Sequence, residues 1–444
     1  MGHVFGRNPR AELPVIAKGD GIYLIDTDGK RYIDASGGAA VSCLGHSDAD
    51  VIAAIKNQID DVAFAHTSFF TSRPTEELAD LLIEMAPDGI EMAYFVSGGS
   101  EAVEAALLMA RQYYYERGET SRKHFIARKQ SYHGNTVGAL SVGSSQYRRV
   151  AVESLLFETS HISPCYAYRY KADSENEEQY GLRIANELET EIKRLGGENV
   201  CAFIAETVSG AAIGCVPPVP GYFKRIREIC DEHGVLLILD EVMCGMGRTG
   251  SHYACEQEGI SPDMITMAKG LGAGYQPIGA VMVSGDIYNT ITEGSGAFRH
   301  SHTYMGHPTA CAGALAVQKA VRDRGLLANV REQGANFQNA LTERLGNQPW
   351  LGDIRGRGLF WGVELVADRA SKEPFDPALK IHEAIKREAM ARGLICYPGT
   401  GTADGEIGNH VLLAPPFIVS EKDVIEIADR LGASIEAAIE GLAL

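Results

Sequence analysis

The chain has 444 residues, of which 45 % are hydrophobic and 22 % are charged. This length and balance are ordinary for a globular protein with a large core and two domains, and they exclude a disordered or fibrous chain. The 41 lysines and arginines are outnumbered by 58 aspartates and glutamates, and the formal charge of −17 at pH 7 would repel nucleic acid phosphates and anionic lipids. A small-molecule partner is therefore favoured, with no nucleic acid and no membrane.

The cysteines point to a reducing compartment. All nine are scattered along the chain without a Cys-x-x-Cys pair, so neither a disulfide framework nor a thiolate zinc site is indicated. No apolar run approaches the roughly 18 residues that a membrane span requires. We expect a cytoplasmic protein.

The N-terminal part of the chain begins with a short β-hairpin. The segment Gly21–Ala35 reads GIYLIDTDGKRYIDA, in which two apolar runs flank a turn at Asp28-Gly29. A helix is predicted next, at about Asp48–Val62.

From about residue 75 to residue 320, helical patterns alternate with short apolar runs. Strands separated by helices imply βαβ units and a mostly parallel sheet. The predicted strands are Tyr94–Val96, His124–Ala127, Cys201–Glu206, Val235–Asp240, Met264–Met267 and Ile278–Val283.

The C-terminal part predicts a second, smaller unit. A helical pattern over Gly325–Gly346 leads away from the sheet, and Leu359–Glu364 and Val411–Leu413 have the pattern of strands. Because the chain has no linker-like tract, the two units should pack closely, with the small one built from both chain ends. The expected division is into an N-terminal part of the small domain, a large domain and a C-terminal part of the small domain, at 1–60, 61–325 and 326–444.

One predicted strand ends at a carboxylate and is followed by a glycine pattern. Val235–Leu239 is a buried-strand run that stops at Asp240, and GMGRTG at 245–250 matches the dinucleotide pattern GxGxxG. In a dinucleotide fold the glycines follow the first strand directly, and the acidic residue comes about 20 residues later. Here the carboxylate precedes the glycines, which favours a tight loop or a chance match over a nucleotide site.

A lysine stands in a comparable place after another predicted strand. The segment Met264–Gly274 reads MITMAKGLGAG, so that a short apolar strand is followed by Lys269 and then by a glycine-rich turn. The glycines leave the amine unobstructed, and a ligand can reach it.

A third segment is suited to holding a phosphate. Residues 94–107 read YFVSGGSEAVEAAL, a strand that passes through glycines into a helix. Glycines before a helix N-terminus, with the hydroxyl of Ser100 at its start, leave backbone N–H groups facing an anion. The alternative is that Ser100 is a plain helix N-cap.

Two loops add further candidate residues to Asp240, Lys269 and the glycine-rich segment before Ser100. SYHGN at 131–135 places an aromatic ring and an imidazole after a strand, and FRHSHTYMGHPTACAGA at 298–314 contains Thr303 in a turn. A lysine amine for an aldehyde, a carboxylate for a ring nitrogen and an anion hole together describe a site for pyridoxal 5′-phosphate (PLP).

The sequence resembles the class III (ω-amino acid type) aminotransferases of PLP fold type I over nearly its whole length. The resemblance implies an α/β fold, with a large domain whose mostly parallel seven-stranded sheet is flanked by helices and a small α+β domain from both chain ends. It is carried, in the family's order, by GGSEAVEAAL, SYHGNTVGALS, AETVSGAAIG, ILDEVMCGMGRTG, MAKGLGAGYQPIGA and HTYMGHPTACAGALA.

The resemblance assigns the two catalytic residues and the ring contacts. It implies that Lys269 is the Schiff-base lysine and that Asp240 is the partner of the pyridinium nitrogen. Val242 would pack on one face of the cofactor ring and Tyr132 on the other.

The same resemblance assigns the remaining cofactor contacts. Gly99 and Ser100 would hold the phosphate, and Thr303 would reach the phosphate of the neighbouring subunit. Glu206 would form a hydrogen bond on the side of the ring hydroxyl, and His133 is counted with the cofactor-binding residues. A site shared between chains makes a homodimer the minimum assembly, with a larger homo-oligomer possible.

The sequence departs from the family where a substrate carboxylate would bind. Many ω-aminotransferases use an arginine of the C-terminal domain there, but no arginine lies between Gly393 and Arg430. Ala211 also replaces the glutamate that pairs with that arginine in γ-aminobutyrate-type relatives. A buried carboxylate still needs a cation, and Arg299 is the substitute candidate, with Tyr397 the second candidate substrate residue.

Three histidines close together raise the question of a metal. His300, His302 and His307 have no acidic residue among them, and Arg299 is adjacent. Cation binding is unfavourable there, so structural histidines and no metal are expected.

The function predicted from these residues is PLP-dependent transamination of an amine or ω-amino acid with a keto acid acceptor. Without a C-terminal guanidinium, the donor should be held by shape and apolar contact. A racemase or aminomutase on the same scaffold remains the alternative, since it needs only a second acid/base opposite the lysine, and a PLP-holding protein without turnover is the rival from another class.

Overall fold

The computed structural model describes residues 3–442. Residues 1, 2, 443 and 444 of the expected domain division lie outside the described residues, and the boundaries of that division stay a prediction.

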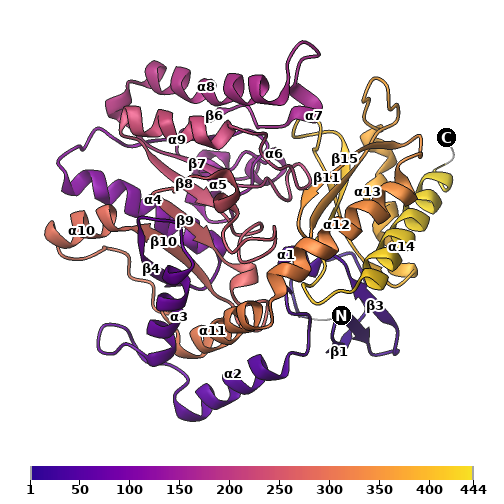
Figure 1. Ribbon diagram of the computed structural model, residues 1–444, viewed down its shortest axis with the longest axis horizontal. Helices are drawn as coiled ribbons and strands as arrows, with labels where there is room; N and C mark the ends of the chain where they lie inside the picture. Colours follow the sequence, from indigo (N-terminus) through magenta and orange to yellow (C-terminus); the bar gives the residue numbers. More distant parts are fainter. Residues whose placement is uncertain (1–2, 443–444) are drawn as a thin grey trace.

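A seven-stranded sheet forms the centre of the larger unit (Figure 1). Its strand order is β4-β10-β9-β8-β7-β5-β6. All neighbours run parallel except β10, which is antiparallel to both β4 and β9. The strands are β4 (Ile90–Val96), β5 (His124–Arg128), β6 (Thr159–Ile162), β7 (Val200–Glu206), β8 (Leu236–Asp240), β9 (Met264–Met267) and β10 (Gly279–Ser284). The expected mostly parallel, seven-stranded sheet is confirmed.

Helices cover both faces of this sheet. Buried side chains of α3, α8 and α9 form one hydrophobic cluster with the sheet, and those of α4 and α10 form another. Every residue of β7, β8 and β9 is buried, which explains why these strands are continuous apolar runs without polar alternation. The helices of this unit are α3 (Arg73–Glu84), α4 (Gly99–Glu116), α5 (Val137–Val142), α6 (Gln146–Arg149), α7 (Ala167–Tyr170), α8 (Glu177–Leu195), α9 (Tyr222–His233), α10 (Gly285–Glu293) and α11 (Pro308–Asp323), with single 3₁₀ turns at Glu153–Leu155, Gly197–Asn199, Ala254–Glu258 and Lys269–Leu271.

Two smaller sheets join the two ends of the chain. The first has the order β1-β2-β3-β13, and its parallel pair β3–β13 places Ile33 opposite Leu394. The second has the order β11-β12-β15-β14. Their strands are β1 (Ile16–Asp20), β2 (Tyr23–Asp26), β3 (Arg31–Asp34), β11 (Leu351–Arg357), β12 (Phe360–Leu365), β13 (Leu394–Ile395), β14 (Tyr397–Thr400) and β15 (Asn409–Leu413).

A single hydrophobic cluster holds this smaller unit together. It contains buried residues of β3 near the N-terminus and of α12, α13 and α14 near the C-terminus, and Figure 1 shows these elements side by side. The expected small unit built from both chain ends is confirmed. The remaining helices are α1 (Gly37–Ala40), α2 (Ala49–Asp61), α12 (Leu326–Leu345), α13 (Ile381–Ala391) and α14 (Glu421–Glu440), with a 3₁₀ turn at Pro377–Leu379.

The sequence pattern located most elements and missed five strands. The hairpin β2–β3 is present, and Gly29 in its turn has a φ of +80°. The missed strands are β1, whose residues are mostly exposed, and β6, whose sequence TSHI carries little apolar signal. Also missed are β11 (LGDIRGR), β13, which has two residues, and β14 (YPGT), because charges, glycines, a proline or short length obscure their patterns.

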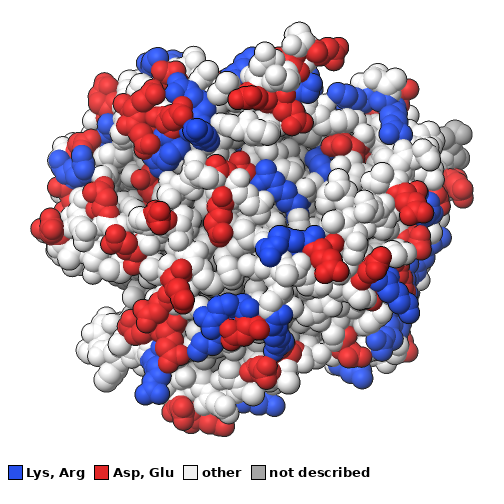
Figure 2. Space-filling view, in the orientation of Figure 1, with Lys and Arg blue, Asp and Glu red and all other residues white. Residues whose placement is uncertain are grey.

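Charged side chains of both signs lie on the face of the molecule that Figure 2 shows. On the face in Figure 2, acidic and basic side chains are interspersed, with no continuous basic stripe. Among residues 3–442, no helix is both long enough and apolar enough to cross a membrane.

Candidate active site

The predicted cofactor residues surround one cavity at the carboxyl ends of β7, β8 and β9. Glu206 is the last residue of β7 and Asp240 the last of β8, and the two are paired in register. Lys269 follows β9. The cavity is lined by every residue expected at the cofactor except Thr303, namely Gly99, Ser100, Tyr132, His133, Glu206, Asp240, Val242 and Lys269.

Lys269 carries an amine that is easily deprotonated. Burial lowers its pKa to about 8, although the nearby carboxylates of Asp240 and Glu206 act in the opposite direction. Desolvation disfavours a charged amine more than these neighbours favour it. A fraction of the amines is therefore uncharged, and hence nucleophilic, near neutral pH.

Asp240 is fixed by two hydrogen bonds and is only 4 % exposed. Its Oδ2 lies 2.7 Å from Nδ1 of His133, and its Oδ1 accepts from the backbone N–H of Val242 at 3.0 Å. Because a carboxylate accepts, the Nδ1 of His133 carries the hydrogen, and the Nε2 of that ring is buried without a partner. The histidine thus orients the carboxylate at the end of β8.

Glu206 orders the loop after β5. Its Oε1 accepts from the backbone N–H of Tyr132 at 3.2 Å, and its Oε2 accepts from that of Gly210 at 2.8 Å. Burial raises the pKa of Glu206, and the charge of Asp240 raises it further, while His133 acts to lower it. The glutamate therefore holds Tyr132 over the cavity.

The N-terminus of α4 faces the same cavity without a side-chain cap. Gly98 is the N-cap residue, so the interpretation of Ser100 as a plain N-cap is wrong. The Ser100 hydroxyl instead accepts from the backbone N–H of Asn135 at 3.1 Å and donates to Asn135 Oδ1 at 2.8 Å. A Cβ on Gly99 would lie 2.8 Å from Val242 Cγ1, which explains the glycine. Free N–H groups and the positive end of an 18-residue helix suit a phosphate.

These groups fit pyridoxal 5′-phosphate. The cavity offers an amine with a lowered pKa for the aldehyde, an oriented carboxylate for the ring nitrogen and a bare helix N-terminus for the phosphate.

The glycine pattern GMGRTG at 245–250 has a structural role. It forms a turn around buried Arg248, whose guanidinium donates to the carbonyls of Leu359 at 3.0 Å and Pro415 at 2.6 Å.

Two predicted residues, Thr303 and Arg299, are not among the described residues that line the cofactor cavity. Thr303 and Arg299 lie in the segment between α10 and α11, where the Arg299 backbone N–H donates to Gln112 Oε1 at 3.0 Å. In the same segment, His300 Nδ1 lies 3.0 Å from the hydroxyl of Tyr94. Among the described residues, the one group close enough to hold a metal is Glu189, Glu232 and His233, and it does not include the histidines of this segment.

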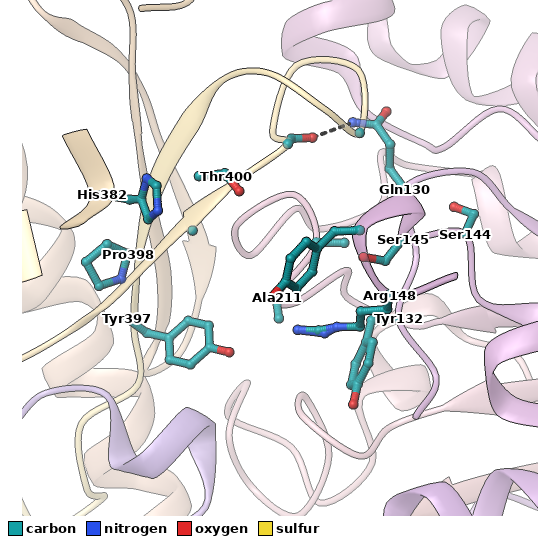
Figure 3. A pocket seen from close by; sticks show the side chains of 15 residues that line it. Gln130, Tyr132, Ser144, Ser145, Arg148, Ala211, His382, Tyr397, Pro398 and Thr400 are labelled. Carbon is teal, nitrogen blue, oxygen red and sulfur yellow. Dashed lines mark hydrogen bonds between the residues drawn. The ribbon is translucent and has the colours of Figure 1, made fainter. Parts of the chain in front are cut away.

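A second cavity of about 210 Å³ adjoins the first and shares Tyr132 with it. Tyr397, the second candidate substrate residue, lines it from β14. Figure 3 shows Arg148 of α6 lying across the ring of Tyr132, with Tyr397 on the other side of the cavity. The sequence pattern did not point to Arg148, because a cation was expected only in the C-terminal segment and beside the histidines. The adjacent basic pair that follows the SYHGN loop is the signal that could have found it.

Comparisons with known proteins agree with this geometry. A family model described as Aminotransferase class-III matches residues 5–435. An uncharacterized aminotransferase of Schizosaccharomyces pombe is 46 % identical over 441 residues, covering 99 % of this chain and 96 % of that protein. The uncharacterized aminotransferase YodT of Bacillus subtilis is 40 % identical over 429 residues, covering 97 % and 96 %. The structure of a PLP-bound aminotransferase mutant from Vibrio fluvialis has a TM-score of 0.91 at 32 % identity, covering 99 % and 97 %.

The chain therefore belongs to the class-III aminotransferase family. It is an enzyme of PLP fold type I, and the groups of its cavity fit that family's cofactor.

The lowered pKa of Lys269 predicts a pH dependence for its chemical modification. In the cofactor-free protein, acetylation of Lys269 should rise through a midpoint near pH 8, because only the uncharged amine reacts. Competitive labelling followed by peptide mass spectrometry measures this midpoint, with exposed Lys193 as the internal control. In Asp240→Asn the midpoint should move to lower pH, since the carboxylate that favours the charged amine is gone. A Lys269 midpoint equal to that of Lys193 would contradict the buried, desolvated position of the amine.

Proposed function

We propose that this enzyme transfers an amino group from a small-molecule amine or ω-amino acid to a keto acid acceptor, with PLP bound at Lys269. The observation that carries the proposal is the meeting of Lys269, Asp240 and the uncapped N-terminus of α4 in one cavity. The family's aminotransferases support the reaction type.

The cofactor supplies an aldehyde for the substrate amine and an aromatic ring that takes up the electron pair when the neighbouring C–H bond breaks. Lys269 Nζ, uncharged above about pH 8, would accept the proton from the substrate carbon and return it to the carbon of the cofactor's former aldehyde group. Asp240 places its negative charge opposite the ring nitrogen, and His133 holds that carboxylate in place. The N-terminus of α4 binds the phosphate, and Tyr132 and Val242 enclose the ring.

A racemase or aminomutase would use the same lysine and aspartate. Such an enzyme needs a second acid/base on the ring face opposite Lys269. The S. pombe and B. subtilis relatives are both named aminotransferases, and this supports transamination over the alternative.

The substitution Asp240→Asn tests the role of the carboxylate. It keeps the size of the side chain and removes the charge, and removing one partner of a buried ion pair costs about 3–5 kcal/mol. We expect the first half-reaction, followed by the loss of cofactor absorbance after mixing with an amine, to slow about 100-fold or more. The exposed change Asp173→Asn is the matched control. An unchanged rate in Asp240→Asn would assign the charge partner to another residue.

We also propose that two copies of the chain form a dimer that shares the site. The segment between α2 and α3 exposes Phe69 (78 %) and Phe70 (66 %), and Phe64 packs on Tyr304 with ring centroids 5.7 Å apart. A neighbouring cavity is lined by Tyr304 and by Ser97, which precedes the phosphate loop. A second copy on this apolar face supports a contact between Thr303 of one chain and the phosphate site of the other.

The substitution Phe69→Glu tests this assembly, because it places a charge in the apolar face. Sedimentation velocity should show a dimer or larger oligomer for the unmodified protein and a shift toward monomer for the variant. Leu182→Glu, on the outer surface of α8, should leave the assembly unchanged. A monomeric unmodified protein that still binds PLP tightly would contradict the shared site.

The cysteines support a reducing location, and we propose the cytoplasm. All nine are free, and eight of them are buried. Burial raises the pKa of most of these thiols, for example that of Cys311 to about 11, so they are poorly reactive. Fractionation of the source cells, with the protein followed by an antibody, would test the compartment.

A further inference from the structure

The cavity beside the lysine contains one fixed positive charge and no negative one. Of the described residues that line it, Arg148 is the one arginine or lysine, and none is an aspartate or glutamate. The other polar groups are hydroxyls, an amide and the imidazole of His382, whose pKa is lowered by burial. The cavity is therefore suited to an anion.

Arg148 has no carboxylate partner within the described chain. No Asp or Glu oxygen among residues 3–442 lies within ion-pair distance of it, and its guanidinium contacts the ring of Tyr132, 4.4 Å from the ring centroid. Its neighbour Arg149 differs, because that guanidinium donates to the carbonyls of Leu140, Ser141 and Gly143. Arg149 thus stabilises the fold locally, whereas the donors of Arg148 are free for a ligand.

The guanidinium of Arg148 extends into the cavity. In Figure 3 it extends over Tyr132 into the cavity, toward Ala211 and Tyr397. The small side chain of Ala211 leaves space in front of it. Its charge also contributes to lowering the pKa of Lys269, so its field reaches the site of proton transfer.

We propose that Arg148 determines specificity by pairing with the carboxylate of a substrate whose amino or keto group lies at Lys269. This inference rests on the proposed transamination and names its substrates as ω-amino acids and keto acids, in preference to uncharged amines. Tyr132 holds the guanidinium by a cation–π contact, and the N–H groups of Arg148, which have no partner among the described residues, can form two parallel hydrogen bonds to a carboxylate. This proposal differs from the expectation that the donor is held mainly by shape and apolar contact.

The test compares charged and uncharged donors of equal length in Arg148→Ala. A series from β-alanine to δ-aminovalerate is measured beside the alkylamine of the same chain length, with the unmodified holoenzyme as reference. We expect the KM of the best amino acid donor to rise about tenfold or more relative to that of the matching alkylamine, while a change in kcat that comes through Lys269 or Tyr132 would be shared by both donors. Arg148→Lys should recover part of the loss, since it keeps the charge without the bidentate geometry. Arg387→Ala, an exposed arginine paired with Glu388, is the control.

A binding measurement separates this inference from the proposed function. Calorimetry with valerate, which has a carboxylate but no amine, should show weaker binding to the Arg148→Ala holoenzyme by about tenfold. If the unmodified enzyme transaminates no donor yet binds valerate through Arg148, the proposed function fails and the anion site stands. If KM rises equally for amino acids and alkylamines, or if valerate affinity does not change, Arg148 does not bind the carboxylate.

Discussion

The site depends on three buried parallel strands that end at the same edge of the sheet. In-register pairing of β7 and β8 brings Glu206 and Asp240 side by side, and β9 delivers Lys269 next to them. Enclosing two carboxylates and an amine costs free energy, so the surrounding groups must hold each of them. His133 and the backbone of Val242 hold Asp240, and backbone N–H groups hold Glu206. For the Lys269 amine, the neighbouring carboxylates offset only part of the cost of burying the charge, so its pKa is lowered.

Other parts of the fold supply the helix N-terminus suited to a phosphate and the walls of the second cavity. The antiparallel strand β10 positions β4, and β4 leads into α4 and its bare N-terminus. The smaller unit contributes Tyr397 to the second cavity, the one that contains Arg148. Pairing of the N-terminal β3 with the C-terminal β13 joins the two chain ends in this unit. The reacting groups therefore come from the large sheet, while the second cavity is lined by residues of both the large unit and the smaller unit.

The sequence predicted the elements whose patterns are set by burial. Strands β7, β8 and β9 are continuous apolar runs, and the chemistry-bearing residues stand at the ends of β8 and β9, so the sequence alone places Asp240 and Lys269 at one sheet edge. The strands β1 and β6 were missed because they are polar or exposed, and β11, β13 and β14 because they are very short or interrupted by glycine, proline or charged residues. The hydrogen bond between His133 and Asp240 joins residues far apart in the sequence, and no local pattern indicates it.

The sequence contains the basic pair Arg148-Arg149, but it does not show which of the two arginines has free donors and is the proposed anion-binding residue. Arg148 lies on a short helix with no periodic signal, and only the folded chain brings it onto Tyr132 and into a cavity without acidic groups. Arg299 was a plausible substitute by sequence, but it lies outside both cavities of its own chain. An arginine that can bind a substrate is identified by N–H donors without partners and by a side chain that extends into a cavity. Both features depend on the tertiary structure.

The proposed covalent attachment of the cofactor to Lys269, at the edge formed by β7, β8 and β9, is the bond on which the proposed reaction depends. Incubation of the protein with PLP, reduction with borohydride and peptide mapping by mass spectrometry test it directly. We expect the added mass of the reduced cofactor on the peptide that contains Lys269, and no such addition in Lys269→Ala. Attachment at another lysine, or equal attachment in the variant, would contradict the assignment.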